Sequence, residues 1–147
     1  MPFVAASYKA NPDAPAGCWV CTRTSPLGPY ANVPPAEVTG APHFCGQCVS
    51  FVTRVCPSLP VATRAWRKGN LAKGHPHIKA GTVIATFDGD GFYHGHAAIY
   101  DSQDERQLNV YDQWVEGHPT AIHPRPLRFG SPLLVNDGTM FFVVEPR

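Results

Sequence analysis

Three short stretches of this chain contain the residue types that nucleophilic catalysis requires, namely a cysteine, a histidine and a carboxylate. The cysteine is Cys48, which follows a polar turn at Gly46 and Gln47 and opens an apolar run. The histidine is His96 and the carboxylate is Asp112. A thiolate is an effective nucleophile when a base lies within hydrogen-bond reach and a third group orients that base. The chemistry therefore depends on the elements that bring these three side chains together.

The spacing of apolar residues on both sides of Gly46 predicts a helix that begins near Gly46 and has Cys48 in its first turn. These residues recur at intervals of three and four between two bounding prolines, at Cys45, Cys48, Val49, Val52, Val55 and Cys56. A helix that begins here places Cys48 among unpaired backbone N–H groups at the positive end of the helix dipole. That position lowers the pKa of a thiol below its free value of about 8.5. The competing interpretation makes Cys48 a small core residue on the apolar face of a short helix.

His96 lies at the entrance to an expected strand over residues 96–100. Gly95 allows another chain segment to approach closely, and the small side chains of Ala97 and Ala98 allow a helix to pack over the start of the strand. That is where the nucleophile must lie if the pair is to meet. A lone strand histidine is more often structural, which is the competing interpretation of His96.

The third group comes from the strand expected at 108–114. If the polar loop 102–107 closes a hairpin, a residue near position 113 lies opposite His96 and can accept a hydrogen bond from its ring. Because a shift of one residue exchanges the faces of a strand, the pattern admits both Asp112 and Gln113. We favour Asp112, since a carboxylate also stabilises the imidazolium, and keep Gln113 as the alternate. Asp112 could instead cap the turn that follows the strand.

The rest of the chain predicts an α+β fold in which the helix packs on one face of an antiparallel sheet. Residues 1–40 form a proline- and glycine-rich arm that wraps the core, with a short strand at 18–22. A second helix, anchored by Trp66, is expected at 61–71. Strands are expected at 81–87, 96–100, 108–114 and 139–144, with a weaker one from Phe129 and 133–135. The prolines between Pro119 and Pro132 predict an extended irregular segment.

Length and composition fit one compact domain over residues 1–147, because the hydrophobic content of 44% supplies a core. The 12 basic and 11 acidic residues are well mixed and give a net charge of +1, which argues against nucleic-acid binding. Residues 1–8 lack the pattern of a secretory signal, and no apolar run approaches the roughly 18 residues of a membrane span. We therefore expect a protein that is made in the cytoplasm, does not insert into a membrane and, if exported, uses another route.

Four strings in this order resemble the papain-like peptidoglycan amidases, including the CHAP domains and the NlpC-type endopeptidases. They are Gly46-Gln47-Cys48 and the segments 81–87, 95–100 and 111–114, and the resemblance covers residues 43–144. The strings Ala-Thr-Phe at 85–87 and Asp-Gln-Trp at 112–114 resemble the small bacterial amidase effectors that type VI secretion delivers. The resemblance implies a papain-like fold, with the nucleophile helix packed on a small antiparallel sheet of about five or six strands.

The resemblance also implies acyl transfer with Cys48 as nucleophile, His96 as general base and Asp112 as orienting group, without a metal or an organic cofactor. The implied substrate is a peptidoglycan peptide, cut at the γ-D-glutamyl–diaminopimelate bond within a stem or at the diaminopimelate–D-alanine crosslink. The implied setting is secretion into the periplasm of a target bacterium. The implied partners are a secretion-machine component and a cognate periplasmic immunity protein. Aromatic residues that could line the substrate groove, although each is more often a core residue, are Trp66, Tyr93 and Trp114.

The chain departs from the papain-type pattern at the oxyanion hole. Papain-type enzymes place a glutamine six residues before the nucleophile, and here that position is Pro42. The oxyanion donor is therefore unassigned beyond the backbone N–H of Cys48, with Tyr30 and His43 as candidates.

The five cysteines admit a second class of function. Cys18 and Cys21 form one CxxC pair and Cys45 and Cys48 form another, with spacing close to that of a zinc ribbon. This alternative makes the chain a zinc-binding module and Cys48 a ligand, but it leaves the histidine and carboxylate strings unexplained. A further alternative is a Cys-His protease that acts on a cytoplasmic protein.

If Cys48 is the nucleophile, four cysteines remain for one or two disulfides in an oxidising compartment, namely Cys18, Cys21, Cys45 and Cys56. Cys45 and Cys56 lie about 16 Å apart along the expected helix, which is too far for a mutual bridge. A bridge from Cys18 or Cys21 to Cys45 or Cys56 would join the arm to the nucleophile helix.

Overall fold

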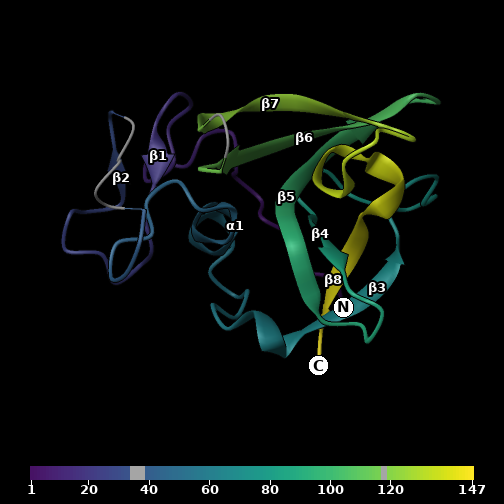
Figure 1. Cartoon of the computed structure of the whole chain (residues 1–147), viewed down its shortest axis with the longest axis horizontal. Coiled ribbons are helices and arrows are strands. Elements are labelled where there is room, and N and C mark those ends of the chain that lie inside the picture. The colour runs from purple at the N-terminus through teal and green to yellow at the C-terminus, as the bar shows by residue number, and fades with distance from the viewer. Residues whose placement is uncertain (34–38, 117–118) are drawn as a thin grey trace.

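The computed structural model describes residues 1–33, 39–116 and 119–147, and its centre is a six-stranded antiparallel sheet (Figure 1). The strands lie in the spatial order β3-β8-β4-β5-β6-β7. Their bounds are β3 Trp66–Leu71, β4 Val83–Phe87, β5 Tyr93–Gln103, β6 Gln107–Trp114, β7 Thr120–Arg128 and β8 Phe142–Pro146. Within the described residues there is one α-helix, α1 (Cys48–Val55), and it packs against β5 and β6. The predicted α+β arrangement is therefore confirmed.

A small two-stranded sheet lies on the other side of α1. Its strands are β1 (Trp19–Val20) and β2 (Tyr30–Ala31), which pair in antiparallel fashion. As Figure 1 shows, α1 lies between this small sheet and the large one. The short strand expected at 18–22 is thus present, although it is shorter than expected.

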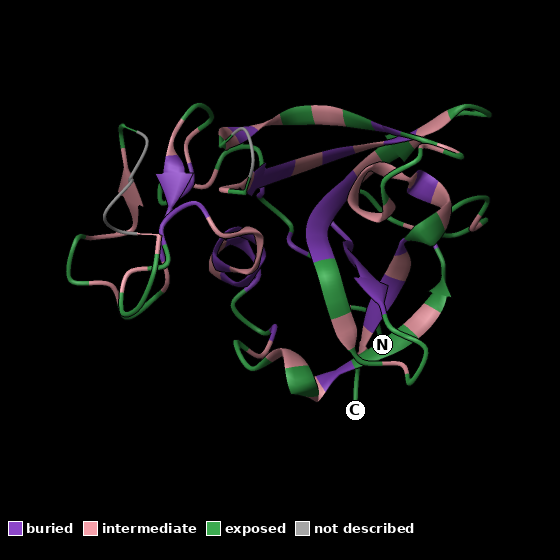
Figure 2. Cartoon of the chain, viewed as in Figure 1, coloured by how far each residue is buried: buried purple, intermediate pink, exposed green. Residues whose placement is uncertain are grey.

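The large sheet has a hydrophobic layer on each face, because consecutive strand residues point to opposite sides. On the face that carries α1, the helix residues Phe51 and Val52 belong to one buried cluster with Val83, Ala97 and Ile99. The opposite face has a second buried cluster, with members Ile84, Ala98, Tyr100, Leu108, Val110, Leu127 and Phe141. Figure 2 shows that β4, between these layers, is buried along its whole length. His96 on β5 and Asp112 on β6 are also buried, and their neighbours along these strands belong to the two clusters.

The start of the N-terminal arm is held against the large sheet by backbone pairing. Val4 forms an antiparallel bridge with Thr82, and the Ala5 N–H donates to the Gly81 carbonyl oxygen at 2.8 Å. At Gly81 φ is +96°, and an added Cβ would lie 2.3 Å from the Ala5 carbonyl oxygen. This close approach requires glycine.

The prediction of a second helix at 61–71 is wrong. Thr63–Ala65 form a single 3-10 turn, η1, and the following residues form β3, an edge strand that pairs with β8. Gly69 lies so close to β8 that an added Cβ would be 2.6 Å from the Val143 carbonyl oxygen. Pairing with a strand at the far end of the chain overrides the local apolar spacing.

The segment expected to be irregular between Pro119 and Pro132 contains β7. This strand forms the other edge of the sheet, where one side of the backbone has no partner strand and Pro124 and Pro126 are tolerated. The weaker strand expected from Phe129 and 133–135 is wrong, because 3-10 turns occupy this region as η2 (Leu134–Asn136) and η3 (Gly138–Met140). Among the described residues, no helix combines the length and hydropathy needed to cross a bilayer.

Candidate active site

Cys48 is the first residue of α1, so the helix begins two residues after Gly46 and the cysteine lies in its first turn, as predicted; the side chain is half-buried. The N-cap residue is Gln47, whose side chain makes no capping hydrogen bond. Gly46 has φ +90°, and an added Cβ would lie 2.5 Å from Val115 and 3.0 Å from Trp19. A tight turn that only glycine can form therefore delivers the thiol to the start of the helix, where backbone N–H groups have no intrahelical partner.

His96 and Asp112 form a buried pair. Nε2 of His96 lies 2.7 Å from Oδ2 of Asp112, and the Asp112 side chain has no exposed surface. The same imidazole interacts with the thiol of Cys48. Because Asp112 engages Nε2, the ring nitrogen left for the thiol is Nδ1. The structure thus brings Cys48, His96 and Asp112 together in one chain of contacts.

The electrostatics of this chain favour a thiolate beside an imidazolium. Burial acts to raise the pKa of Cys48, but the hydrogen bond and charge of His96 outweigh it and lower this pKa below its ordinary value. Burial acts to lower the pKa of His96, but its hydrogen bonds to Asp112 and Cys48 outweigh burial and raise this pKa to about 9. An ion pair of this kind is the state in which a cysteine attacks.

Arg125 is a further member of the site that the sequence did not reveal. Its guanidinium donates to Oδ2 of Asp112 from Nε at 3.0 Å and from Nη2 at 2.7 Å, and from Nη1 to Oδ1 of Asn136 at 2.7 Å. Burial acts to raise the pKa of Asp112, but hydrogen bonds from His96 and Arg125 hold it below its ordinary value. The guanidinium also lies 4.6 Å from the centre of the Trp114 ring. No short-range signal marks Arg125, because it lies on β7, which local patterns do not predict.

Gln113, the alternate for the orienting role, bonds to a different part of the molecule. Its Oε1 accepts from the Val20 N–H at 2.8 Å, and its Nε2 donates to the carbonyl oxygens of Val20 at 3.0 Å and Gln47 at 2.8 Å. Gln113 therefore ties β1 to the residue before α1. Of the two residues considered for the orienting role, Asp112 is the one whose side chain bonds to His96.

A cavity of about 1180 Å³ lies beside the thiol. The residues that line this cavity include Cys48, Tyr93, His96, Trp114 and Arg125. Tyr93 and Trp114, two of the three aromatic residues expected in the substrate groove, therefore line this cavity, whereas Trp66 is not among the described residues that line it. Trp66 is fully buried in the core, and its indole N–H donates to the Pro60 carbonyl oxygen at 2.8 Å.

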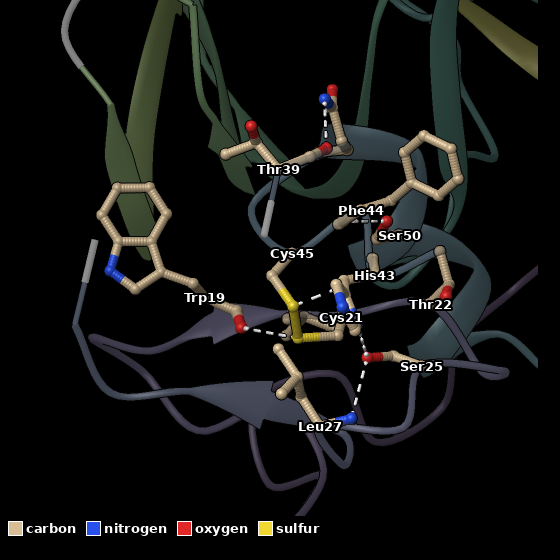
Figure 3. The surroundings of a disulfide bond; sticks show 12 residues. Trp19, Cys21, Thr22, Ser25, Leu27, Thr39, His43, Phe44, Cys45 and Ser50 are labelled. Carbon is tan, nitrogen blue, oxygen red and sulfur yellow. Dashed lines mark hydrogen bonds between the residues drawn. A yellow bond between two sulfur atoms is a disulfide. The ribbon is translucent and has the colours of Figure 1, made fainter. Parts of the chain in front are cut away.

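The two side chains considered as oxyanion donors lie apart from this cavity. Neither Tyr30 nor His43 belongs to the described residues that line it. Tyr30 pairs with Val20 in the small sheet, and Nδ1 of His43 lies 3.3 Å from Oγ of Ser25 beside the disulfide (Figure 3). The structure therefore leaves the backbone N–H of Cys48 as the remaining donor among those considered.

A disulfide joins Cys21, directly after β1, to Cys45, three residues before the thiol of Cys48 (Figure 3). It is one of the bridges predicted between the arm and the nucleophile helix, while Cys18 and Cys56 are free. The zinc-ribbon alternative is wrong, because two of the four sulfurs that it needs as zinc ligands, those of Cys21 and Cys45, are bonded to each other. Among the described residues, no group of three or more histidine, cysteine or acidic side chains is placed to hold a metal ion.

Comparison with known families assigns the chain. The family model described as "Domesticated amidase effector 2" matches residues 28–144, which is well over half of the sequence. This chain belongs to the domesticated amidase effector 2 family. The matched residues include all of α1 and the strands that carry His96, Asp112 and Arg125.

Individual relatives agree with membership in the domesticated amidase effector 2 family. The chain is 34% identical over 103 residues to "Domesticated amidase effector 2" of Ixodes scapularis, and the aligned region covers 67% of this chain and 70% of the relative. It is 32% identical over 92 residues to "Type VI secretion amidase effector 2 protein" of Salmonella typhi, and the aligned region covers 58% of this chain and 65% of that relative. A solved structure titled "Type 6 secretion amidase effector 2 (Tae2)" is similar, with a TM-score of 0.58, 27% identity, and coverage of 69% of this chain and 81% of the other. These matches confirm the resemblance to amidase effectors.

Proposed function

We propose that this chain is a cysteine amidase that hydrolyses amide bonds in the peptides of bacterial peptidoglycan. The observation that carries the proposal is the chain of contacts from Cys48 through His96 to Asp112 at the wall of a large cavity. The thiol lies at the start of a helix and the base lies on a strand of the sheet against which that helix packs. This arrangement supports a papain-like fold.

The proposed reaction is acyl transfer in two steps. The Cys48 thiolate attacks the carbonyl carbon of the scissile amide, and the His96 imidazolium gives its proton to the leaving amine as the carbon–nitrogen bond breaks. The same imidazole, now neutral, takes a proton from water as the water oxygen attacks the thioester carbon. The carbon–sulfur bond then breaks, which releases the acid product and restores the Cys48 thiolate beside the His96 imidazolium. Asp112 keeps the ring oriented and stabilises its charged form, and Arg125 keeps Asp112 ionised.

The substrate class and setting rest on the amidase effectors to which the chain is similar. From these relatives we extend to this chain the role of a secreted antibacterial effector that acts in the periplasm of a target bacterium. A secretion-machine component and a cognate periplasmic immunity protein are the partners that such a role requires. The γ-D-glutamyl–diaminopimelate bond and the diaminopimelate–D-alanine crosslink are the bonds that the proposal includes.

Digestion of purified peptidoglycan, with the products resolved by mass, tests the proposal. The native chain should release fragments whose masses identify the bond that is cut, and Cys48→Ala and His96→Ala should each release none. The losses should be of similar size, because the two residues act as one unit. Circular dichroism should show that both variants remain folded.

Cys18→Ala is the matched control, because Cys18 is also a free, half-buried cysteine and lies outside the described lining of the cavity. It should digest peptidoglycan at the native rate. Activity retained in Cys48→Ala would show that the wrong cysteine has been assigned. Intact peptidoglycan after treatment with the native chain would reject the substrate class.

A further inference from the structure

Tyr93 contacts the nucleophile directly, and the proton transfers described above make no use of it. Its hydroxyl oxygen lies 3.3 Å from Sγ of Cys48. The side chain is half-buried and lines the cavity. Thus a second polar group, besides the imidazole of His96, meets the sulfur on the side where a substrate would bind.

Packing fixes the direction of this hydroxyl. The Tyr93 ring meets the Trp66 ring edge to face, with the ring centres 5.0 Å apart. Trp66 is itself fully buried and held by its hydrogen bond to Pro60. Tyr93 is also the first residue of β5 and pairs with Phe87 of β4. A hydroxyl held by a buried aromatic pair and by a strand pairing is pre-organised, so little rearrangement accompanies its hydrogen bond.

The direction of the hydrogen bond follows from the charges. Burial raises the pKa of Tyr93 far above its ordinary value, and the charge of Cys48 raises it further, so the hydroxyl keeps its proton at neutral pH. A thiolate has no proton to donate, so the hydroxyl is the donor. The backbone N–H of Ala97 also acts to lower the pKa of Cys48. The Tyr93 hydroxyl, at 3.3 Å, is therefore one of several groups near the sulfur that favour its negative charge.

We propose that Tyr93 is a catalytic residue, whose O–H donates a hydrogen bond to the Cys48 thiolate and then to the oxyanion of the tetrahedral intermediate. This inference rests on the proposed function. As the sulfur–carbon bond forms, the electron pair of the carbonyl double bond moves to the oxygen, two bonds away from the sulfur. The pair returns when the carbon–nitrogen bond breaks and His96 protonates the leaving amine. Tyr93 keeps its own proton throughout, and with the backbone N–H of Cys48 it supplies two donors.

The test is Tyr93→Phe, which removes one oxygen and keeps the ring that packs on Trp66. With peptidoglycan peptides as substrate, kcat should fall by about 10² to 10³ while KM stays within about twofold, as for the loss of one oxyanion donor. Without substrate, the pH dependence of Cys48 alkylation by iodoacetamide should move to higher pH, because the thiolate loses a donor. Both the native chain and Tyr93→Phe should carry Cys18→Ala in this measurement, because Cys18 is the other half-buried free thiol and would also react.

Tyr30→Phe is the matched control, because it makes the same chemical change outside the described lining of the cavity, and it should leave kcat and the alkylation profile unchanged. Native kcat in Tyr93→Phe, or a change confined to KM, would overturn the proposal. An unmoved alkylation profile would overturn the contact with the thiolate. If Cys48→Ala proves active, it is the proposed function that fails, and the alkylation measurement still decides whether Tyr93 acts on the sulfur.

Discussion

The ion pair between Arg125 and Asp112 allows a quantitative test of the buried network. Replacing Arg125 with methionine keeps a long side chain but removes the charge and the hydrogen bonds that reach Asp112. The carboxylate has no exposed surface and the Arg125 side chain is only 12% exposed, so solvent can replace little of what is lost. Breaking a buried pair by removing one partner costs about 3 to 5 kcal/mol. Since His96 still contacts the carboxylate, we expect a cost at the lower end, about 3 kcal/mol.

For a domain of this size, each 1 kcal/mol corresponds to a change in Tm of about 2 to 4 °C. Arg125→Met should therefore lower Tm by about 6 to 12 °C, measured by calorimetry at pH 7. Arg128→Met is the matched control, because Arg128 is an exposed arginine on the same strand, β7. A surface substitution of this kind should change the free energy of unfolding by no more than about 0.5 kcal/mol.

A double-mutant cycle and the pH dependence decide whether the cost comes from the charge. In the Asp112→Asn background, Arg125→Met should cost clearly less, because no buried carboxylate remains to be left unpaired. Hydrogen bonds from His96 and Arg125 outweigh burial and hold the folded-state pKa of Asp112 below its unfolded value of about 3.9. The stabilisation that Arg125 contributes is therefore present above that pH and is lost as the pH falls through the folded pKa. The gap between the native chain and Arg125→Met should therefore narrow in acid. Equal Tm losses for Arg125→Met and Arg128→Met, or equal costs in both backgrounds, would refute this reasoning.

Three further predictions concern activity, the disulfide and the site of action. Because the pKa of Cys48 is lowered and that of His96 is raised to about 9, kcat/KM should rise as the thiol deprotonates and fall near pH 9 as the imidazolium deprotonates. Asp112→Asn should move the alkaline limb of the pH–rate profile to lower pH, and an unmoved limb would contradict the role of the carboxylate. Reducing the Cys21–Cys45 bridge, whose sequence separation is 24, should lower the free energy of unfolding in urea by about 3 to 4 kcal/mol. The unreduced denatured chain should titrate three thiols, and stability that is unaffected by reductant would contradict the bridge. Fusion of a Sec signal should make the chain lyse a Gram-negative host while the fused Cys48→Ala variant does not, whereas lysis by the unfused chain would indicate a target inside the cell.

The parts of the site that the sequence predicts are those held by local structure. The start of α1 follows from a glycine turn and apolar spacing within a dozen residues of Cys48. His96 and Asp112 are joined by a hairpin, so the turn near Asp104 brings their strands together. The choice between Asp112 and Gln113 needs the register, which the spacing of residues does not determine to one position.

The parts that the sequence does not predict depend on strands that are distant along the chain. Residues 61–66 have helix-like apolar spacing, yet Trp66 begins a strand that pairs with β8 near the C-terminus. The prolines of β7 suggest an irregular segment, yet an edge position tolerates them, and this hides Arg125. Trp66 has the type of a groove residue, and only its position under Tyr93 assigns it to the core. In each case the missing information is the identity of a non-local neighbour.

The adjacent residues Asp112 and Gln113 point to opposite faces of β6, and this has a consequence for recombining segments between relatives. One side chain orients the base and the other holds the residue before the nucleophile, so deleting or inserting a single residue within β6 ahead of them would exchange both partners at once. The exposed turn over 88–90 carries no such dependence and should accept extra residues. In a chimera, β6 is therefore the segment to transfer whole, together with its pairing to β5, whereas crossover points belong in that turn.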